Sequence, residues 1–193
     1  MVLKRFSVVL ALLAALFVAG CAGSQRDAQV TRADIDALAD AIATLGEGVD
    51  PAEAARAAEI AYTHTKVLAA EYQITDPPLI HNMKVNQGLR PRGLCWHWAQ
   101  DMQTRLMQEE FQTLTLHRAI ANADNPFRID HSTVIVSSRG DAFTDGIVLD
   151  PWRLGGQLHW TPTLQDDSYT WVHRQEVFAD RRARLALKEQ RAR

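Results

Sequence analysis

The chain has 193 residues, and its 23 acidic residues slightly outnumber its 21 basic ones, which gives a formal net charge of −2 at pH 7. This balance gives no support to nucleic-acid binding, which calls for a strongly basic face. The length suits one domain with a real hydrophobic core.

The first 21 residues have the layout of a secretion signal. Lys4 and Arg5 precede an apolar run over residues 6–18, which only Ser7 interrupts, and small residues follow up to Cys21. A charged start, a short apolar core and small residues at a cleavage point are the three parts of such a signal. The run falls short of the roughly 20 apolar residues that cross a bilayer.

Residues 18–21, Val-Ala-Gly-Cys, resemble the lipobox of bacterial lipoproteins, where a signal peptidase cuts before a Cys that is then lipidated. The resemblance implies a signal peptide over residues 1–20 and acylation of Cys21, by palmitate among other chains, so that the membrane is a partner. Ala22 stands where an Asp would favour inner-membrane retention in enteric bacteria. The expected location is therefore the cell envelope, at the outer membrane facing the periplasm. The alternative is an ordinary secreted protein with a chance Cys at the cleavage site.

Cys95 is the only thiol of the folded body if Cys21 is acylated, because the chain has two cysteines in all. It cannot then form an internal disulfide. A lone thiol in an oxidising compartment is a liability unless it is buried or used. Cys95 is therefore either a core residue or a functional group.

The first half of the body predicts helices. Residues 21–30 are small and polar, which predicts a flexible tether ahead of a single domain over residues 31–193. One helix is expected from Thr31 to the glycines at 46 and 48, and another from Asp50 to about Tyr72. Each opens with a residue that caps helix N-termini, and the first has apolar residues at helical spacing.

The next segment carries turn residues and then a further helix. Residues 79–94 contain one proline and two glycines, which predicts an irregular loop. A third helix is expected to begin at Cys95, with an apolar stripe spaced four, three and four residues apart: Cys95, Ala99, Met102 and Leu106.

The second half of the body predicts strands. Residues 113–121 alternate, residues 131–138 are β-branched, residues 146–150 predict a further strand, and residues 157–173 are expected to hold one more short strand. The tail from about Arg174 is charged and predicts a helix. Helices followed by strands predict an α+β fold, with N-terminal helices packed on an antiparallel sheet.

Three residues have the chemistry of a thiol nucleophile and its helpers. Cys95 opens a helix, whose unpaired backbone N–H groups and macrodipole stabilise a thiolate. His131 opens a strand and would act as general base and acid, and Asp150 closes the next strand and would orient the imidazole. If the two strands pair as a hairpin, the start of one lies beside the end of the other. The strand geometry therefore predicts a His131–Asp150 contact.

Three short segments resemble transglutaminase-like thiol enzymes of the papain-like superfamily. Residues 93–99 (GLCWHWA) look like the nucleophile helix, while residues 131–134 (HSTV) and 149–152 (LDPW) are similar to the His strand and the Asp-Pro strand. Gln87, in an Asn-Gln-Gly segment, resembles the papain residue that donates to the oxyanion, although its gap to Cys95 is longer here. The backbone N–H of Cys95 would be the other oxyanion donor.

The resemblance implies a papain-like (transglutaminase-like) α+β fold and acyl transfer through a thioester. The enzyme would be a cysteine peptidase or amidase, or an acyltransferase, and it would need no cofactor and no metal. Its location suggests peptides, proteins or peptidoglycan stem peptides as substrates. The rival hypotheses are a non-catalytic envelope lipoprotein that uses the same fold to bind a partner, and a structural lipoprotein in which the three residues coincide by chance.

Each candidate residue also has a structural interpretation. Cys95 could be a core thiol, His131 an ordinary strand residue, Asp150 a turn cap and Gln87 a loop residue. His97 is assigned to a helix face, because residues two apart on a helix diverge, which also argues against a zinc site with Cys95. Four tryptophans near the motifs are either core or the wall of a substrate cleft: Trp96, Trp98, Trp152 and Trp160.

Overall fold

Helices come first in the chain and strands follow, as the hydrophobic patterning predicts. The structure is a computed structural model and describes residues 30–192. The signal peptide (1–20), Cys21 and the tether up to residue 29 lie outside the described residues. The helices of the described part are α2 (Arg32–Ala43), α3 (Pro51–Glu71), α4 (Pro78–Asn86), α5 (Cys95–Met107) and α6 (Arg174–Arg191).

One antiparallel sheet follows the first four of these helices, in the strand order β4-β3-β2-β1-β5. Its strands are β1 (Leu114–Ala121), β2 (His131–Ser138), β3 (Ile147–Asp150), β4 (His159–Pro162) and β5 (Val172–His173). The α+β class is confirmed. The segment 157–173 holds two strands where one was predicted, and the second, β5, has only two residues, too few to give a periodic signal.

The starts of the first two helices follow from their capping residues. Thr31 and Asp34 exchange hydrogen bonds as a capping box at the start of α2, and the Asp50 carboxylate accepts a hydrogen bond from the backbone N–H of Ala52 at the start of α3. Such caps satisfy backbone donors that have no partner within the helix. Both predicted starts are confirmed.

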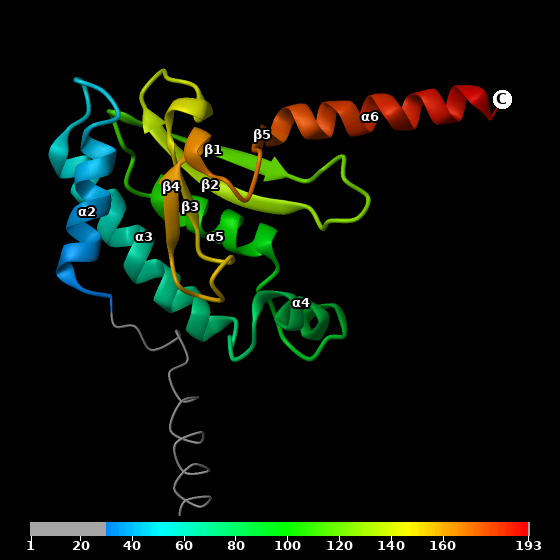
Figure 1. Ribbon diagram of the computed structural model, residues 1–193, viewed down its shortest axis with the longest axis horizontal. Coiled ribbons are helices and arrows are strands. Elements are labelled where there is room, and N and C mark those ends of the chain that lie inside the picture. Colours follow the sequence, from blue (N-terminus) through cyan, green and yellow to red (C-terminus); the bar gives the residue numbers. More distant parts are fainter. Residues whose placement is uncertain (1–29, 193) are drawn as a thin grey trace, which may run out of the picture.

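The helices α2, α3 and α5 gather on one face of the sheet (Figure 1). α5 packs on β1 and β2, α3 packs on α5, and α2 packs on α3. The apolar residues between these layers form the main core, with Met102 and Leu106 of α5 against Val134 and Val136 of β2. Burial of this apolar area is what fixes α5, and with it Cys95, relative to the sheet.

The other face of the sheet is covered by loops and by a smaller apolar cluster that includes Ile135, Val148 and Trp171. α6 leads away from the sheet and projects beyond the body (Figure 1), and Val177 is its buried residue. The predicted charged, helical tail is confirmed. Within residues 30–192, no helix combines the length and the apolar character that crossing a membrane requires.

The prediction of an irregular loop over residues 79–94 is wrong in its first half, which forms α4. α3 ends at Glu71, ahead of the two prolines, and Pro78 takes the first helical position of α4, where a missing N–H costs nothing. Only His81 of α4 is buried, while Leu79 and Ile80 are exposed. α4 therefore has no apolar stripe from which it could be predicted.

The turn that leads into α5 depends on Gly93. Its φ is +120°, and a Cβ atom at this position would lie 2.4 Å from Nε2 of His81. That nitrogen donates a hydrogen bond of 2.8 Å to the backbone oxygen of Arg92. Glycine therefore allows the chain to pass close to the buried His81 and to enter the helix at Cys95.

We predict that Gly93→Ala is far more destabilising than Gly88→Ala. Gly88 also has a positive φ (+74°), but a Cβ there would meet no atom within 4 Å. Gly88→Ala should therefore cost only the backbone strain, about 1 kcal/mol, whereas Gly93→Ala must also displace His81 and should cost at least about 2 kcal/mol more. Urea unfolding of the two variants measures the difference, and equal midpoints would contradict it.

Candidate active site

The three residues singled out in the sequence lie at the ends of secondary-structure elements. Cys95 is the first residue of α5, His131 the first of β2 and Asp150 the last of β3. β2 and β3 pair antiparallel with Val134 opposite Leu149. The start of β2 therefore lies beside the end of β3, and the predicted hairpin is confirmed.

His131 and Asp150 form a buried pair. Nε2 of His131 lies 2.6 Å from Oδ2 of Asp150, and the two side chains are each 1% exposed. Burial by itself would raise the pKa of Asp150, but the charges and hydrogen bonds of His131 and Arg153 hold it below its ordinary value. The predicted His131–Asp150 contact is confirmed, and its carboxylate is ionised.

The ring of His131 is enclosed by aromatic side chains. Its centroid lies 4.7 Å from the ring of Trp152, 4.6 Å from that of Tyr169 and 5.3 Å from that of Trp171. Burial among these rings lowers the pKa of His131, but the charge and hydrogen bond of Asp150, together with Cys95, more than offset it and raise the pKa to about 9. His131 is therefore an imidazolium at neutral pH.

Cys95 lies beside this pair at the N-terminus of α5. Its side chain is buried, with 6% of the residue exposed, and its thiol donates a hydrogen bond of 3.4 Å to the backbone oxygen of Asp130. Nδ1 of His131, the ring nitrogen that does not face Asp150, is buried and has no hydrogen-bond partner among the described residues. Cys95 is among the groups that raise the pKa of His131. Since Nε2 is bonded to Asp150, Nδ1 is the ring nitrogen that remains available to the thiol.

His97 secures the start of α5. Its Nδ1 accepts hydrogen bonds of 3.2 Å from the backbone N–H groups of Gly93 and Leu94. Burial and, after it, the charge of Arg92 lower the pKa of His97 to about 4, so the ring is neutral and can accept. His97 therefore caps the helix that carries Cys95, as a residue on a helix face.

A second layer of charged residues, which was not predicted from the sequence, holds Asp150. The backbone N–H of Arg153 donates to Oδ1 of Asp150 (3.1 Å), and its Nε donates to Oδ2 (2.9 Å). The two terminal nitrogens of Arg153 donate to the carboxylate of Asp166, at 3.1 and 2.6 Å. The indole N–H of Trp171 donates to the same carboxylate at 2.9 Å. Trp171, which packs on His131, is thus bonded to the carboxylate that holds Arg153.

Only part of this layer left a signal in the sequence. Arg153 comes three residues after Asp150, at the end of the Asp-Pro-Trp segment, and a cation so close to a carboxylate is a candidate partner. Asp166 and Trp171 lie in the irregular segment between β4 and β5. Because no periodicity marks their positions, only the folded structure places them beside Arg153.

Gln87 makes no hydrogen bond with the three residues in the described part of the chain. It is exposed at the C-terminal end of α4. The core role is confirmed for two of the tryptophans near the motifs, Trp98 and Trp152, which are buried in one apolar cluster. Trp152 also packs on His131, Trp160 is half-buried, and Trp96 is 45% exposed next to Cys95.

A cavity of about 550 Å³ is lined in part by Tyr169, whose ring lies 4.6 Å from that of His131. It is bordered by the β1–β2 connection, the segment before β5 and the first turns of α6, and Cys95 is not among its lining residues. Tyr169 thus both packs on the His131 ring and lines the cavity. The cavity is therefore adjacent to the three residues but does not open on the sulfur.

No protein-family model, curated protein or solved structure matches this chain. In the part of the chain that the structure describes, no group of three or more His, Cys, Asp or Glu side chains could hold a metal ion. The geometry described above is therefore the basis for a functional assignment.

We predict that Asp150→Asn lowers the pKa of His131 from about 9 to below the ordinary value of about 6.5. The substitution removes the charge that offsets burial, so burial then favours the neutral ring. Titration of the His131 ring by NMR measures both values, and an unchanged midpoint would refute the proposed origin of the shift.

The same shift has a consequence for stability. Because the pKa of His131 is raised in the folded state and that of Asp150 is lowered, the pair stabilises the fold fully from the ordinary pKa of a carboxyl group, about 4, up to pH 6.5, and progressively less as pH rises through about 9. The difference in unfolding free energy between the wild type and Asp150→Asn should therefore shrink over this range.

Proposed function

We propose that the protein is a membrane-anchored thiol enzyme that cleaves or transfers amide bonds of peptide or protein substrates. The observation that carries the proposal is the buried 2.6 Å contact between His131 and Asp150 beside the thiol at the first residue of α5. Cys95 is the nucleophile, His131 the general base and acid, and Asp150 the residue that orients the imidazole.

The arrangement of elements supports a papain-like, transglutaminase-like fold for this proposal. A nucleophile helix packs on an antiparallel sheet whose neighbouring strands carry the His at a start and the Asp at an end. The order of the three residues in the chain is the one that the sequence resemblance implies. β2 and β3 are consecutive strands and pair antiparallel, so their pairing alone brings His131 beside Asp150.

In the first half of the proposed reaction, an imidazolium on His131 stabilises the thiolate of Cys95. The sulfur attacks the carbonyl carbon of the amide, and the backbone N–H of Cys95 donates to the developing oxyanion. Nδ1 of His131 gives its proton to the nitrogen of the leaving amine, the C–N bond breaks, and a thioester to Cys95 remains. Gln87 would have to move from its exposed position to serve as a second oxyanion donor.

In the second half, His131 accepts a proton from the incoming nucleophile through Nδ1. Water or an amine attacks the thioester carbon, the C–S bond breaks, and Cys95 returns as a thiolate beside an imidazolium. Water yields a carboxylic acid and an amine yields a new amide, so access to the thioester decides between hydrolysis and transfer. No step uses a cofactor.

The N-terminal segment determines where this chemistry would take place. Lipidation at Cys21 would tether the domain to the membrane, with the outer membrane facing the periplasm as the proposed location. Multiple acyl chains, which bacterial lipoproteins carry, hold a protein durably where a single chain holds it only marginally. Substrates are then peptides, proteins or peptidoglycan stem peptides within reach of a short tether.

We predict that iodoacetamide alkylates Cys95 of the full chain at pH 6 at least about tenfold faster than it alkylates Cys95 of His131→Ala. An ordinary thiol, with a pKa of about 8.5, is largely protonated and slow at this pH. Peptide mapping separates the label on Cys95 from any on Cys21. His117→Ala is the matched control, since His117 is also a strand histidine but bonds to Ser137.

His131→Gln provides a second variant in case the smaller side chain unfolds the protein, and urea unfolding checks both. Equal, slow labelling of wild type and both variants would identify Cys95 as an inert core thiol and favour the non-catalytic lipoprotein. With reactivity established, a thiol-directed activity probe and a panel of peptide and cell-wall substrates, run against Cys95→Ala, define the acyl donor.

The lipid anchor has a separate test in a Gram-negative host. The full chain should be found in the outer-membrane fraction, with the mass of a chain that begins at Cys21 and carries acyl groups. Cys21→Ser should lose both the acyl mass and membrane retention. An unacylated wild-type protein released into the periplasm would indicate an ordinary secreted protein instead.

A further inference from the structure

Arg118 lies on β1, on the face of the sheet that α5 covers. It stands opposite Val134 of β2, and Val134 packs in the same core cluster as Met102 of α5. Residues directly opposite each other on paired strands share a face. The side chain of Arg118 therefore extends between the sheet and the N-terminal part of α5.

The guanidinium of Arg118 reaches the residue next to the nucleophile. One terminal nitrogen donates a long hydrogen bond of 3.4 Å to the backbone oxygen of Trp96. Nε is buried and has no hydrogen-bond partner in the described chain. Much of the donor fork of this side chain is therefore left without a protein acceptor, and Cys95 is close enough to influence its charge.

Arg118 forms no salt bridge with any carboxylate of residues 30–192, in contrast to Arg153 and Arg92, which bond directly to Asp150 and Asp101. Burial and the neighbouring charge of Arg174 lower its pKa to about 10, while Cys95 and Asp101 act in the opposite direction. Arg118 is therefore still charged at neutral pH. Burying a cation without a counter-ion costs free energy, and binding of an anion would offset that cost.

We propose that Arg118 binds a carboxylate of the substrate close to the amide that Cys95 attacks. The proposal rests on the proposed function and deepens it, because it assigns the substrate class: acidic peptides, whose carboxylate lies within a few bonds of the scissile carbonyl. A guanidinium suits this role because its planar fork can bond both oxygens of a carboxylate at once.

Two alkylating reagents of nearly the same shape test the proposal. Iodoacetate and iodoacetamide both lose iodide to the thiolate and form the same C–S bond, but only iodoacetate carries a carboxylate beside the reacting carbon. The ratio of their rates at Cys95, divided by the same ratio for glutathione, reports attraction of the anion by the site. In the full-length wild type this normalised ratio should exceed one.

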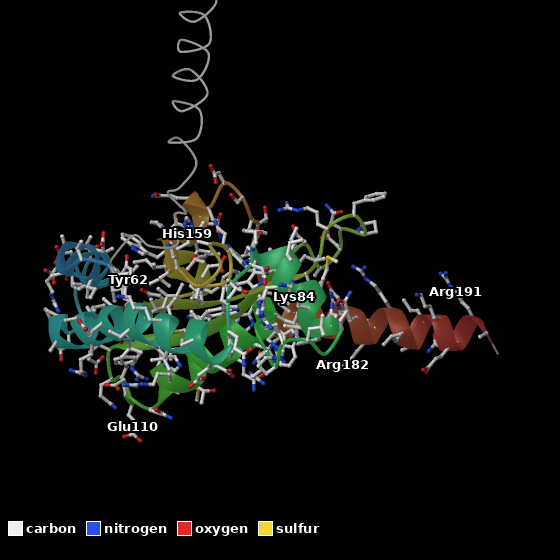
Figure 2. All side chains as sticks on the ribbon, turned by 90° about the horizontal axis from the view of Figure 1, so that it is seen from below. Tyr62, Lys84, Glu110, His159, Arg182 and Arg191 are labelled. Carbon is white, nitrogen blue, oxygen red and sulfur yellow. The ribbon has the colours of Figure 1, made fainter. Side chains whose placement is uncertain are left out.

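Arg118→Gln should lower the ratio about tenfold, because it removes a nearby charge in a partly buried site, and should change the iodoacetamide rate much less. Arg118→Lys, which keeps the charge but loses the fork, should fall between the two. Arg182→Gln is the matched control, since Arg182 is exposed on the projecting helix α6 (Figure 2) and its loss removes the same net charge. The Arg182→Gln ratio should equal that of the wild type.

Acetate binding gives a readout that does not depend on thiol reactivity. Titration of sodium acetate into the labelled protein should shift the Nε–H signal of Arg118 in NMR spectra, and sodium chloride at equal ionic strength should not. If Cys95 resists both reagents while acetate still shifts this signal, the enzyme proposal fails and the anion site stands. The proposed anion site is wrong if Arg118→Gln leaves the normalised iodoacetate-to-iodoacetamide ratio unchanged. It is also wrong if acetate does not shift the Nε–H signal of Arg118.

Discussion

The buried contact between His131 and Asp150 is the interaction on which the rest of the site depends. Each of these charges, taken from water alone, would cost several kcal/mol, so neither can be stable there without the other. Asp150 is further held by the backbone and side chain of Arg153, and Arg153 by Asp166. The pair is thus the inner part of a chain of charges that alternate in sign, and its outer members are needed because the inner ones are shielded from solvent.

That contact constrains the sheet as well as the charges. His131 and Asp150 lie on adjacent antiparallel strands, and a shift of β2 against β3 by one residue would turn one set of side chains to the opposite face. The apolar alternation of both strands resists such a shift, because Val134 and Leu149 belong to the main core while Ile135 and Val148 pack on the other face. Core packing and site geometry therefore require the same register.

The parts of the structure that could be predicted are those governed by local chemistry or by strand pairing. Capping residues located the starts of α2 and α3, and the order of His131 and Asp150 along two neighbouring strands was enough to predict their contact. α4 was missed because its apolar side chains face solvent, so burial leaves no periodic pattern. The bonds of Asp166 with Arg153 and Trp171 depend on the path of an irregular segment, which is set by tertiary packing and not by neighbouring residues.

Two arginines near the candidate site, Arg153 and Arg118, differ in how many protein acceptors they have. Arg153 bonds two carboxylates of its own chain, so its charge and three of its five side-chain N–H donors are used within the fold. Arg118 bonds only the backbone oxygen of Trp96, and its Nε has no partner among residues 30–192. If Arg118 served to stabilise the fold, we would expect a carboxylate from a neighbouring element to pair with it, as Asp166 pairs with Arg153. A cation kept near Cys95 without such a carboxylate is instead suited to an anion that binds and dissociates.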